Sequence, residues 1–518
     1  MRPPHPFFSV ITPVYDPPVD VLEEMIGSVL AQSDGDLELV LVDDASTRDE
    51  VRVALREAAA ADARVRVIER PTNGGIVAAS GDAVAAARGE FLVLVDHDDL
   101  LLPRALAVVR AAVEEHPEVD YLYSDEDKLG PDGTVYHEFR KPGWSPERLR
   151  SHMYTGHLSV MRTEVVRQVG GFRPGYDGSQ DHDLALRVGE AARAVVHVPE
   201  TLYHWRVVPG SAAGVADAKP YAWEAGRRAV EDHLNRVGLR ARAERGDLTG
   251  TYRVRRAVDP DLLVSVVIVT DGASSAVWGQ ERLHVVEAAR SVVERAGHPA
   301  LELVVVHGPG TPARTLTLLR RVVGDRLRLV AHDRADDGAA ARNVGVLHAR
   351  GAVVLLLDES TEVRSQDLVA ELVGPLSEPD VAAVGAHLSG PDDLLLHAGY
   401  LVAEGRVAPA GASRTPTDTG TFAELAVARE VSALPAACLA VRRDLFEEVG
   451  GLSESLPTAV ADVDLSLKLR RTGRRLVWQP AARAFQLLPP RLPSDEEVAA
   501  LAERWDLSGP DAYLPGAR

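Results

Sequence analysis

Three carboxylates follow a strongly apolar run near residue 95 of the chain. The stretch "LVLVDHDD" (92–99) ends in Asp96, Asp98 and Asp99, with His97 between the first two. Carboxylates this close repel one another unless they face water or share a cation. Mg²⁺ and Mn²⁺ prefer oxygen ligands, and one or two carboxylates together with substrate phosphates make a common site. Two interpretations remain open at this point: a divalent metal site, or a solvated turn in which Asp99 caps the next helix.

Alternating strand and helix patterns indicate where these carboxylates lie. The apolar spacing predicts strands at 7–15, 37–46, 64–70 and 90–96 and helices at 19–32, 49–61 and 76–88. Continuous apolar strands joined by helices are typical of a parallel sheet covered on both faces. Such sheets bind ligands at the carboxyl ends of their strands. We expect Asp43, Asp44, Asp96 and Asp98 at those ends, which favours a functional site over a solvated turn.

The composition limits the classes of protein that fit. The 518 residues are 46% hydrophobic, which suggests two to four globular domains. With 57 basic and 77 acidic residues the net charge is −20, which argues against a nucleic-acid partner. The single cysteine, Cys438, excludes an intrachain disulfide and suits a reducing cytoplasm, and its apolar flanks predict a core position.

The sequence also guides the expected location. The first residues show no pattern of a signal peptide, and no apolar run reaches about 18 residues. We therefore expect a cytoplasmic protein, with peripheral contact at the inner face of the cell membrane as the only form of membrane contact.

The second half of the chain repeats the first. The segments "LLVSVVIVT" (262–270), "LELVVVHGPGT" (301–311) and "ARGAVVLLLDEST" (349–361) follow the order of "FFSVITPVY" (7–15), "LELVLVDDAST" (37–47) and "ARGEFLVLVDHDD" (87–99). One fold used twice explains this order. We expect one domain over 1–257 and a second over 258–518, the latter ending in a short capped helix that packs on it.

The second copy keeps the apolar pattern and loses several polar groups. The exchanges are Asp43 to His307, Asp98 to Ser360 and His204 to Gln486, while Asp96 and Asp181 are matched by Asp358 and Asp462. If these polar groups served only to cap strands, there would be little reason for several of them to be lost in the same copy. We expect an active first copy and a weakly active or inactive second copy that helps to position acceptor or partner. The alternative is that both copies are active, the second through Asp358, Glu359 and Asp462.

Five motifs of the first copy resemble family 2 of the glycosyltransferases, which have the GT-A nucleotide-sugar fold. They occur in this order: "SVITPVYD", "VDDAS", "VDHDD", "GGF…GSQDHDLALR" and "LYHWR". The resemblance covers most of residues 7–215 and is strongest to enzymes of O-antigen, capsule and cell-wall polysaccharide assembly, such as rhamnosyltransferases. It implies an α/β fold of GT-A type, with a Rossmann-like, mostly parallel sheet flanked by helices, in two tandem copies of which the second is degenerate.

The resemblance also implies roles for individual residues. Asp181 would be the catalytic base. A divalent metal, Mn²⁺ or Mg²⁺, would be bound by the Asp-x-Asp motif and a histidine: Asp98, Asp96 and His204. The nucleotide sugar would be held by Pro13, Tyr15, Asp43, Asp96, Arg206 and Ser211. The stretch "YLYSDEDKLG" resembles the same subgroup, and we expect its acids, Glu126 among them, in a surface loop.

The implied reaction suits these residue types. A metal stabilises the charge that develops on a leaving diphosphate, and a carboxylate takes the proton of the acceptor hydroxyl. The resemblance implies inverting transfer from a nucleoside-diphosphate sugar, a UDP- or dTDP-sugar, to a saccharide or lipid-linked saccharide acceptor. A non-catalytic scaffold that binds nucleotide sugars or saccharides is the alternative. A nucleotidyltransferase is disfavoured because "TPVYDPPVD" contains no glycine-rich phosphate loop.

Three positions have simpler explanations or depart from the family. Asp183 could pair with Arg187 one helical turn later, and His204 could be a packed core histidine. Members of the family often carry asparagine in the helix before the metal-binding strand, where this chain has Gly81; the second copy has Asn343.

Overall fold

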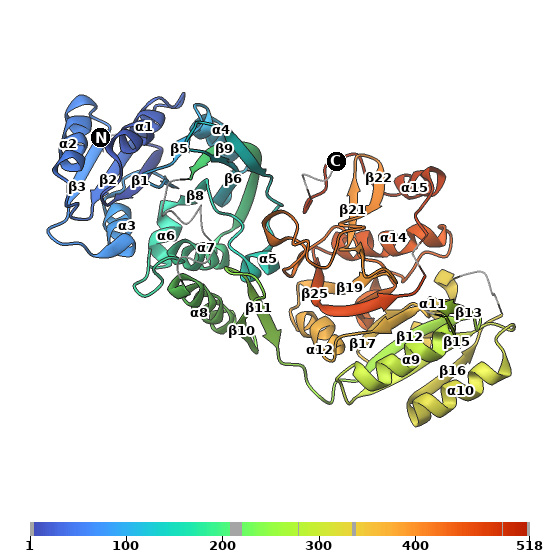
Figure 1. The fold of residues 1–518 in the computed structure, drawn as a ribbon. Helices are drawn as coiled ribbons and strands as arrows, with labels where there is room; N and C mark the ends of the chain where they lie inside the picture. The colour runs from blue at the N-terminus through green and yellow to red at the C-terminus, as the bar shows by residue number, and fades with distance from the viewer. Residues whose placement is uncertain (1–4, 208–219, 278, 334–337, 489–490, 515–518) are drawn as a thin grey trace. The chain divides into compact units, whose positions relative to one another are not determined.

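A computed structural model describes the chain except residues 1–4, 208–219, 278, 334–337, 489–490 and 515–518 (Figure 1). The chain divides into two compact units. Unit 1 comprises Met1–Trp144, Leu149–Gly238 and Ala243–Arg253, and unit 2 comprises Ser145–Arg148, Leu239–Arg242 and Val254–Arg518. In the described parts of the chain, no helix is both long and apolar enough to span a membrane.

Unit 1 is built around a nine-stranded sheet in the order β3-β2-β1-β4-β8-β6-β9-β5, with β7 paired to β6. The strands are β1 (Phe8–Val14), β2 (Leu37–Asp43), β3 (Val65–Glu69), β4 (Phe91–Leu94), β5 (Leu100–Leu101), β6 (Val119–Leu129), β7 (Val135–Phe139), β8 (Ser159–Arg162) and β9 (Ala194–Arg206); β10 (Ala241–Arg245) and β11 (Tyr252–Arg256) form a separate pair. The first four strands are parallel, and β8 runs antiparallel to β4.

Helices cover both faces of this sheet, as the alternation of patterns predicts. They are α1 (Val19–Leu30), α2 (Asp49–Ala61), α3 (Gly75–Ala86), α4 (Ala105–Glu115), α5 (Pro146–Ser151), α6 (Thr163–Gln168), α7 (Gln180–Ala191) and α8 (Pro220–Arg236). The apolar faces of α1, α2 and α4 join β1, β2 and β4 in one core cluster, and α3 lies on the other face (Figure 1). The strands and helices predicted for the first 100 residues are confirmed.

Unit 2 has a ten-stranded sheet in the order β16-β15-β12-β17-β24-β19-β25-β18, with β20 paired to β19 and β23 to β25. Its strands are β12 (Val264–Thr270), β15 (Leu301–His307), β16 (Leu327–Ala331), β17 (Val353–Leu357), β18 (Thr361–Val363), β19 (Val381–Ser389), β20 (Leu395–His397), β23 (Arg429–Glu430), β24 (Cys438–Arg442) and β25 (Arg475–Gln486). Two further pairs are β13 (Ser274–Val277) with β14 (Gln280–Leu283) and β21 (Tyr400–Ala403) with β22 (Arg406–Pro409).

The helices of unit 2 follow the same plan. They are α9 (His284–Arg295), α10 (Ala313–Val323), α11 (Gly338–His348), α12 (Leu368–Val373), α13 (Arg443–Glu448), α14 (Thr458–Arg471) and α15 (Asp495–Ala502). Ser494 and Glu497 form a capping box at the start of α15, and Val498 and Leu501 pack in a cluster with residues of α14. The predicted capped helix in the tail is confirmed, and Cys438 is buried as expected.

The two sheets have the same strand order. From one edge of the sheet to the other, the strand order in unit 1 is β3, β2, β1, β4, β8, β6, β9 and β5. The corresponding order in unit 2 is β16, β15, β12, β17, β24, β19, β25 and β18. The correspondence holds at the level of single residues: Val14 pairs with Asp43 at the end of β1, and Thr270 pairs with His307 at the end of β12. The repeat deduced from the sequence is therefore a repeat of the whole topology, and each copy serves as a reference for the other.

A buried glutamate ties the first strands of unit 1 together. Glu38 of β2 is 1% exposed, and its Oε1 accepts hydrogen bonds from Ser9 Oγ at 2.7 Å and from the Arg88 N–H at 2.6 Å. The Gly89 N–H donates to Ser9 Oγ at 2.8 Å. These bonds fix the turn before β4, whose other end carries the three carboxylates.

Unit 2 repeats this arrangement. Ser265 Oγ and the Arg350 N–H donate to Glu302 Oε1, both at 2.6 Å, and the Gly351 N–H donates to Ser265 Oγ at 2.8 Å. Both copies thus keep a buried carboxylate that serves the fold.

Replacing Glu302 by leucine is expected to lower the free energy of unfolding by about 2 kcal/mol, because the Ser265 hydroxyl and the Arg350 N–H lose their acceptor inside the protein. Urea unfolding of the full chain measures this change. Glu294→Leu, at an exposed position of α9, is the matched control and should change stability by less than about 0.5 kcal/mol. Equal effects of the two substitutions would contradict the structural role of Glu302.

Two histidines of unit 2, the buried His397 and the partly buried His387, are expected to make it sensitive to acid. His397 is fully buried, and neither ring nitrogen has a hydrogen-bond partner among the described residues. Burial lowers the pKa of His397 to about 3 and the pKa of His387 to about 4. An unfolded chain protonates its histidines near pH 6.5, whereas the folded unit keeps these two neutral until the pH is much lower.

Stability is therefore expected to be full above pH 6.5 and to fall between pH 6.5 and about 4, by roughly 1.4 kcal/mol per pH unit for each of the two histidines. Melting temperatures of the full chain measured across this range test the slope. His397→Phe should make the slope shallower, whereas the same change at His116, whose side chain is 42% exposed, should leave it unaltered. Parallel slopes for both variants and the unmodified chain would show that other groups cause the acid sensitivity.

Candidate functional site

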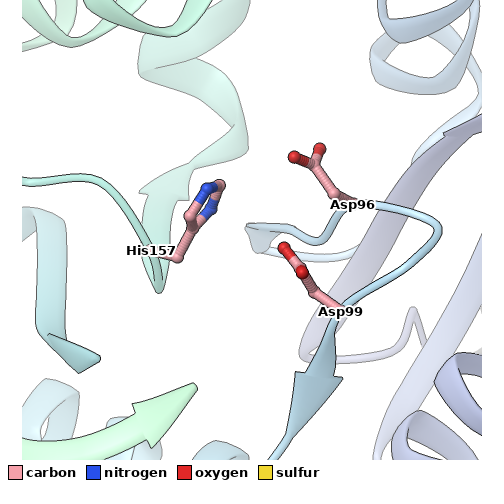
Figure 2. A group of neighbouring side chains, drawn as sticks. All are labelled: Asp96, Asp99 and His157. Atoms are coloured by element: carbon pink, nitrogen blue, oxygen red, sulfur yellow. The ribbon is translucent and has the colours of Figure 1, made fainter. Parts of the chain in front are cut away.

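Asp96, Asp99 and His157 point into a common space at the end of the parallel strands (Figure 2). One ligand atom from each lies within 4.8 Å of the others. Asp96 and Asp99 belong to the loop between β4 and β5, and His157 directly precedes β8. Because β4 and β8 are antiparallel neighbours, with Leu94 opposite Ser159, the end of one strand meets the start of the other. The topology thus brings together residues that are about 60 positions apart.

The carboxylates of this loop are held by neutral donors. Asp99 is 1% exposed; Tyr203 Oη donates to its Oδ2 at 2.5 Å and the Arg206 N–H to its Oδ1 at 2.8 Å. Burial, reinforced by the charges of Asp96 and Asp98, raises the pKa of Asp99 well above its usual value. Burial also raises the pKa of Asp98. A cation bound among these groups would relieve both effects.

The donor set fits a divalent metal. Carboxylate oxygens suit Mg²⁺ and Mn²⁺, and an imidazole nitrogen favours a transition metal, which Mn²⁺ is. Two carboxylates and one imidazole, with buried and uncompensated negative charge, are therefore a chemically reasonable site for Mn²⁺ at Asp96, Asp99 and His157.

The interpretation of this stretch as a solvated turn is wrong for Asp99. Helix α4 begins at Ala105, and its N-cap residue, Arg104, makes no side-chain capping bond. The Asp99 carboxylate cannot cap the helix because Tyr203 and Arg206 already occupy it. Sequence spacing gave no sign of these partners, which come from β9, about 100 residues later.

Arg206 braces the carboxylate loop. Its Nε donates to the Asp98 carbonyl at 2.8 Å, and its guanidinium pairs with Glu24 of α1. The sequence predicts that this side chain contacts phosphate; in the structure it forms a hydrogen bond and an ion pair within the protein. Ser211, the other predicted phosphate contact, lies outside the described residues.

His204 and Asp98 occupy places beside the cluster of three. His204 pairs with Leu100 across β9 and β5, and its Nδ1 is hydrogen-bonded to Asp127 of β6. Within the part of the chain that the structure describes, Asp96 shares its close cluster with Asp99 and His157. The structure thus offers a second set of ligands beside the Asp96, Asp98 and His204 suggested by the family resemblance.

The residues predicted to hold the nucleotide meet at the same edge of the sheet. Pro13 lies near the end of β1, and its carbonyl oxygen is 3.1 Å from His97 Nδ1 in the carboxylate loop. Tyr15 is the first residue after β1 and is 47% exposed, so its ring is accessible to a ligand. Asp43 ends β2 opposite Val14, and its Oδ1 accepts the Ser46 N–H at 3.0 Å.

Asp44, which the sequence also places at this edge, holds the following loop. Its carboxylate accepts the N–H groups of Gly74 and Gly75 at 2.9 and 2.8 Å and pairs with Arg70. The positive φ of Gly75, 81°, suits glycine and aims its N–H at the carboxylate. The pair of aspartates in "VDDAS" was the available signal: one faces the strand end and the other holds the next loop.

Asp181 and Asp183 divide their roles at the start of α7. Asp183 is fully buried and pairs with Arg187 at 2.6 Å, one turn later, and also with Arg173. The predicted pairing at i+4 is confirmed. Asp181 is half-buried in the first turn, and its Oδ1 accepts the N–H of His182 at 2.8 Å.

The expected surface loop at "SDEDK" is wrong. These residues belong to β6, which lies between β8 and β9 in the sheet. Asp125, Glu126 and Asp127 are only 4%, 3% and 6% exposed. Charged residues at successive positions disguised a strand that the preceding apolar "YLY" run could have signalled.

The matching edge of unit 2 has a different chemistry. The Ser360 N–H and hydroxyl both donate to Asp358 Oδ1, at 2.9 and 2.6 Å. Thr270 Oγ1 donates to the Glu359 carboxylate, and burial raises the pKa of Glu359 to about 7. A polar cavity of about 180 Å³ opens beside them, with His307 in its wall. The carboxylates of this copy are bonded to their own neighbours.

The exchange of Gly81 and Asn343 has a structural basis in unit 2. Asn343 of α11 donates through Nδ2 to the Leu452 carbonyl at 2.9 Å and accepts the Leu452 N–H at 3.0 Å. The corresponding turn of unit 1 is held by Arg187, which donates to the Val169 and Gly171 carbonyls, both at 2.7 Å. Lys468 of unit 2 likewise donates to the Gly451 carbonyl, at 3.1 Å, so the Asn343 bonds are an addition in unit 2. Nothing in the structure explains why unit 1 lacks this addition.

Comparison with known proteins gives relatives over nearly the whole chain. The O-antigen biosynthesis protein RfbC of Myxococcus xanthus is 34% identical over 92% of this chain and 37% of its own length. The uncharacterized protein y4gI of Sinorhizobium fredii is 40% identical over 93% of this chain and 53% of its own length. The chain thus spans about half or less of these relatives.

Solved structures with a similar region include S. aureus TarS 1–349 in complex with UDP-GlcNAc, at 21% identity and a TM-score of 0.36 over 44% of this chain and 66% of TarS 1–349. Mannosyltransferase PcManGT from Pyrobaculum calidifontis, in complex with GDP-Man and Mn²⁺, gives 22% identity and a TM-score of 0.34 over 45% of this chain and 64% of that one.

The sequence profile described as "Glycosyl transferase family 2" matches residues 9–170 and 280–450. One matched segment lies in each half of the chain, which, with the repeated topology, confirms the expected tandem GT-A copies. The expected enzyme class, glycosyltransferase, is the class that defines this family. Because the two segments make up more than half of the chain, the protein belongs to glycosyl transferase family 2.

Proposed function

We propose that unit 1 catalyses inverting, metal-dependent transfer of a sugar from a nucleoside-diphosphate sugar to a hydroxyl of a saccharide acceptor. The observation that carries this proposal is the group formed by Asp96, Asp99 and His157 at the carboxyl end of β4, in a member of a glycosyltransferase family. In parallel α/β sheets this is the edge at which ligands bind. A UDP- or dTDP-sugar is the donor that the family resemblance favours.

The residues of this edge would divide the work. A divalent metal bound there would act as a Lewis acid on the leaving diphosphate. Asp96 belongs to both proposed ligand sets, the one with Asp99 and His157 and the one with Asp98 and His204. Arg206 would contribute positive charge near the phosphates, and Ser211 a hydroxyl.

The remaining residues would bind the nucleoside and take the proton. Tyr15 and Pro13 would line the site of the base and ribose, and the Asp43 carboxylate would accept an N–H of the base. Asp181 would be the general base for the acceptor hydroxyl. The neighbouring Asp183 forms ion pairs with Arg187 and Arg173. Asp181 is therefore the carboxylate of this motif that would act as the base.

The acceptor and the second copy complete the proposal. The relative from Myxococcus xanthus is named as an O-antigen biosynthesis protein, which supports a saccharide or lipid-linked saccharide acceptor and peripheral contact with the inner face of the membrane. We take residues 1–257 as the catalytic domain and 258–518 as a degenerate domain that positions acceptor or partner. The internal bonding of Asp358 by Ser360 supports a loss of metal binding there.

Asp181→Asn is expected to reduce sugar transfer by roughly 100- to 10,000-fold, the usual contribution of a general base, without weakening nucleotide binding. Transfer is measured by release of nucleoside diphosphate from UDP- and dTDP-sugars with Mn²⁺. Thermal shifts of the full chain with UDP, dTDP or GDP report binding. Asp177→Asn, an exposed carboxylate nearby, is the matched control.

Retained transfer in Asp181→Asn would exclude Asp181 as the base. Nucleotide binding by an unmodified chain that transfers no sugar would favour the alternative, a non-catalytic binding scaffold.

The two proposed ligand sets differ in which histidine substitution should weaken metal binding more. We expect His157→Ala to weaken Mn²⁺ binding by more than about tenfold, because even the loss of a residue that only orients a metal ligand weakens binding by that factor. The effect should exceed that of His204→Ala. The reason is that the His157 ring already lies beside Asp96 and Asp99, whereas His204 lies outside this close cluster. Calorimetric titration of the full chain with Mn²⁺ measures both. The reverse order would favour the set with Asp98 and His204.

A further inference from the structure

The acidic strand β6 contacts both histidines that flank the carboxylate loop. Its three acids, Asp125, Glu126 and Asp127, are buried in the middle of the sheet. Charges are costly in such a place unless each has a specific partner. The partners of two of them are the segments that carry His157 and His204.

Glu126 and Lys141 form a clamp on the backbone of His157. The His157 N–H donates to Glu126 Oε2 at 2.7 Å, and Lys141 Nζ pairs with the same oxygen at 2.9 Å. Lys141, which is fully buried, also donates to the carbonyls of His157 and of Thr155. Both backbone polar groups of His157 are thus held by one buried ion pair.

Gly156 allows this clamp to close. A Cβ atom at this position would lie 2.8 Å from Glu126 Oε2, so the carboxylate would have to shift away, and the backbone φ of +38° also favours glycine. The carboxylate therefore approaches the chain directly beside His157 because the preceding residue has no side chain.

Asp127 acts on the other histidine through its ring. Its carboxylate is hydrogen-bonded to His204 Nδ1, which leaves Nε2 as the nitrogen able to bind a ligand. A carboxylate on one ring nitrogen is the usual way in which a metal-binding histidine is oriented. The adjacent positions on β6 thus hold the two histidines by different means, one through its backbone and one through its ring.

Unit 2 shows that the fold does not need these groups. The register of β6 with β9 and of β19 with β25 matches Glu126 to Leu388 and Asp127 to Ser389. The same pairings place Phe485, and not the Gln486 expected from the sequence, at the position of His204. Unit 2 nevertheless keeps the strand order and two buried carboxylates of unit 1: Glu302 for Glu38 and Asp464 for Asp183. The groups that are lost together are those directed at the site.

We propose that Asp127, and Glu126 together with Lys141, are positioning residues that hold His204 and His157 in place for metal binding beside Asp96. This inference rests on the metal site of the proposed function. It assigns a role to the stretch "SDEDK" that neither its charge nor its burial explains otherwise.

Two variants test the proposal, and their Asp127→Ser and Glu126→Leu substitutions introduce the residues that unit 2 has at these positions. Asp127→Ser removes the partner of the His204 ring, and Glu126→Leu with Lys141→Met removes the clamp while avoiding an unpaired buried charge. We expect each to lower the Mn²⁺ affinity of the full chain by about tenfold, the loss typical of a group that orients a ligand. Calorimetric titration with Mn²⁺ alone measures the affinity, and circular dichroism melting verifies that each variant is folded.

Asp120→Asn is the matched control. Asp120 lies on the same strand and is 1% exposed, but it pairs with Arg162 and Arg193 at 2.8 and 2.6 Å, away from the histidines. It should lower the melting temperature and leave Mn²⁺ affinity unchanged.

Unchanged affinity in both test variants, alongside a loss in Asp96→Asn, overturns the positioning role and leaves the metal site intact. A loss in only one variant supports the role for that histidine and overturns it for the other. No Mn²⁺ binding by the unmodified chain overturns the metal site and the positioning role together.

Discussion

The repulsion among Asp96, Asp98 and Asp99 is the constraint around which unit 1 is arranged. These residues leave a buried parallel strand, so water alone does not separate their charges. Tyr203 and the Arg206 backbone hold Asp99, and the Arg206 side chain holds the loop through the Asp98 carbonyl. All of these donors come from the end of β9. This long strand lies between β6 and β5 in the sheet, and its length brings the donors to the carboxylate loop. The antiparallel half of the sheet thus supports the loop that the parallel half presents.

The duplication separates what the fold needs from what the site needs. Glu38 and Glu302 make the same hydrogen bonds in the two units, and Asp183 with Arg187 has its counterpart in Asp464 with Lys468. These pairs hold turns that both copies require. The groups that differ lie at the carboxyl ends of the strands or face them from β6. A comparison within one chain is informative because both copies solve the same packing problem.

The sequence was sufficient for the parallel half and insufficient for the site. Strands β1 to β4 are continuous apolar runs between amphipathic helices, so period and length identify them. Strand β6 was missed because its acids contradict the rule that charges face water, a rule that fails where each charge has a buried partner. His157 was missed because its significance lies in neighbours that are distant in the chain, and "TGHL" has no pattern to show this. Asp99 was misjudged for the same reason.

The two copies of the carboxylate loop show two solutions to one electrostatic problem. Unit 2 has fewer carboxylates in the loop: serine replaces the second aspartate, and Ser360 donates both its N–H and its hydroxyl to Asp358. Unit 1 keeps three carboxylates and adds two histidines held by buried acids, an arrangement that raises the pKa of Asp99 through burial and through neighbouring charge. Since unit 2 demonstrates that this topology tolerates the simpler loop, the retained charge in unit 1 costs stability without serving the fold. In the proposed function, a bound cation would be the partner that turns this cost into binding energy.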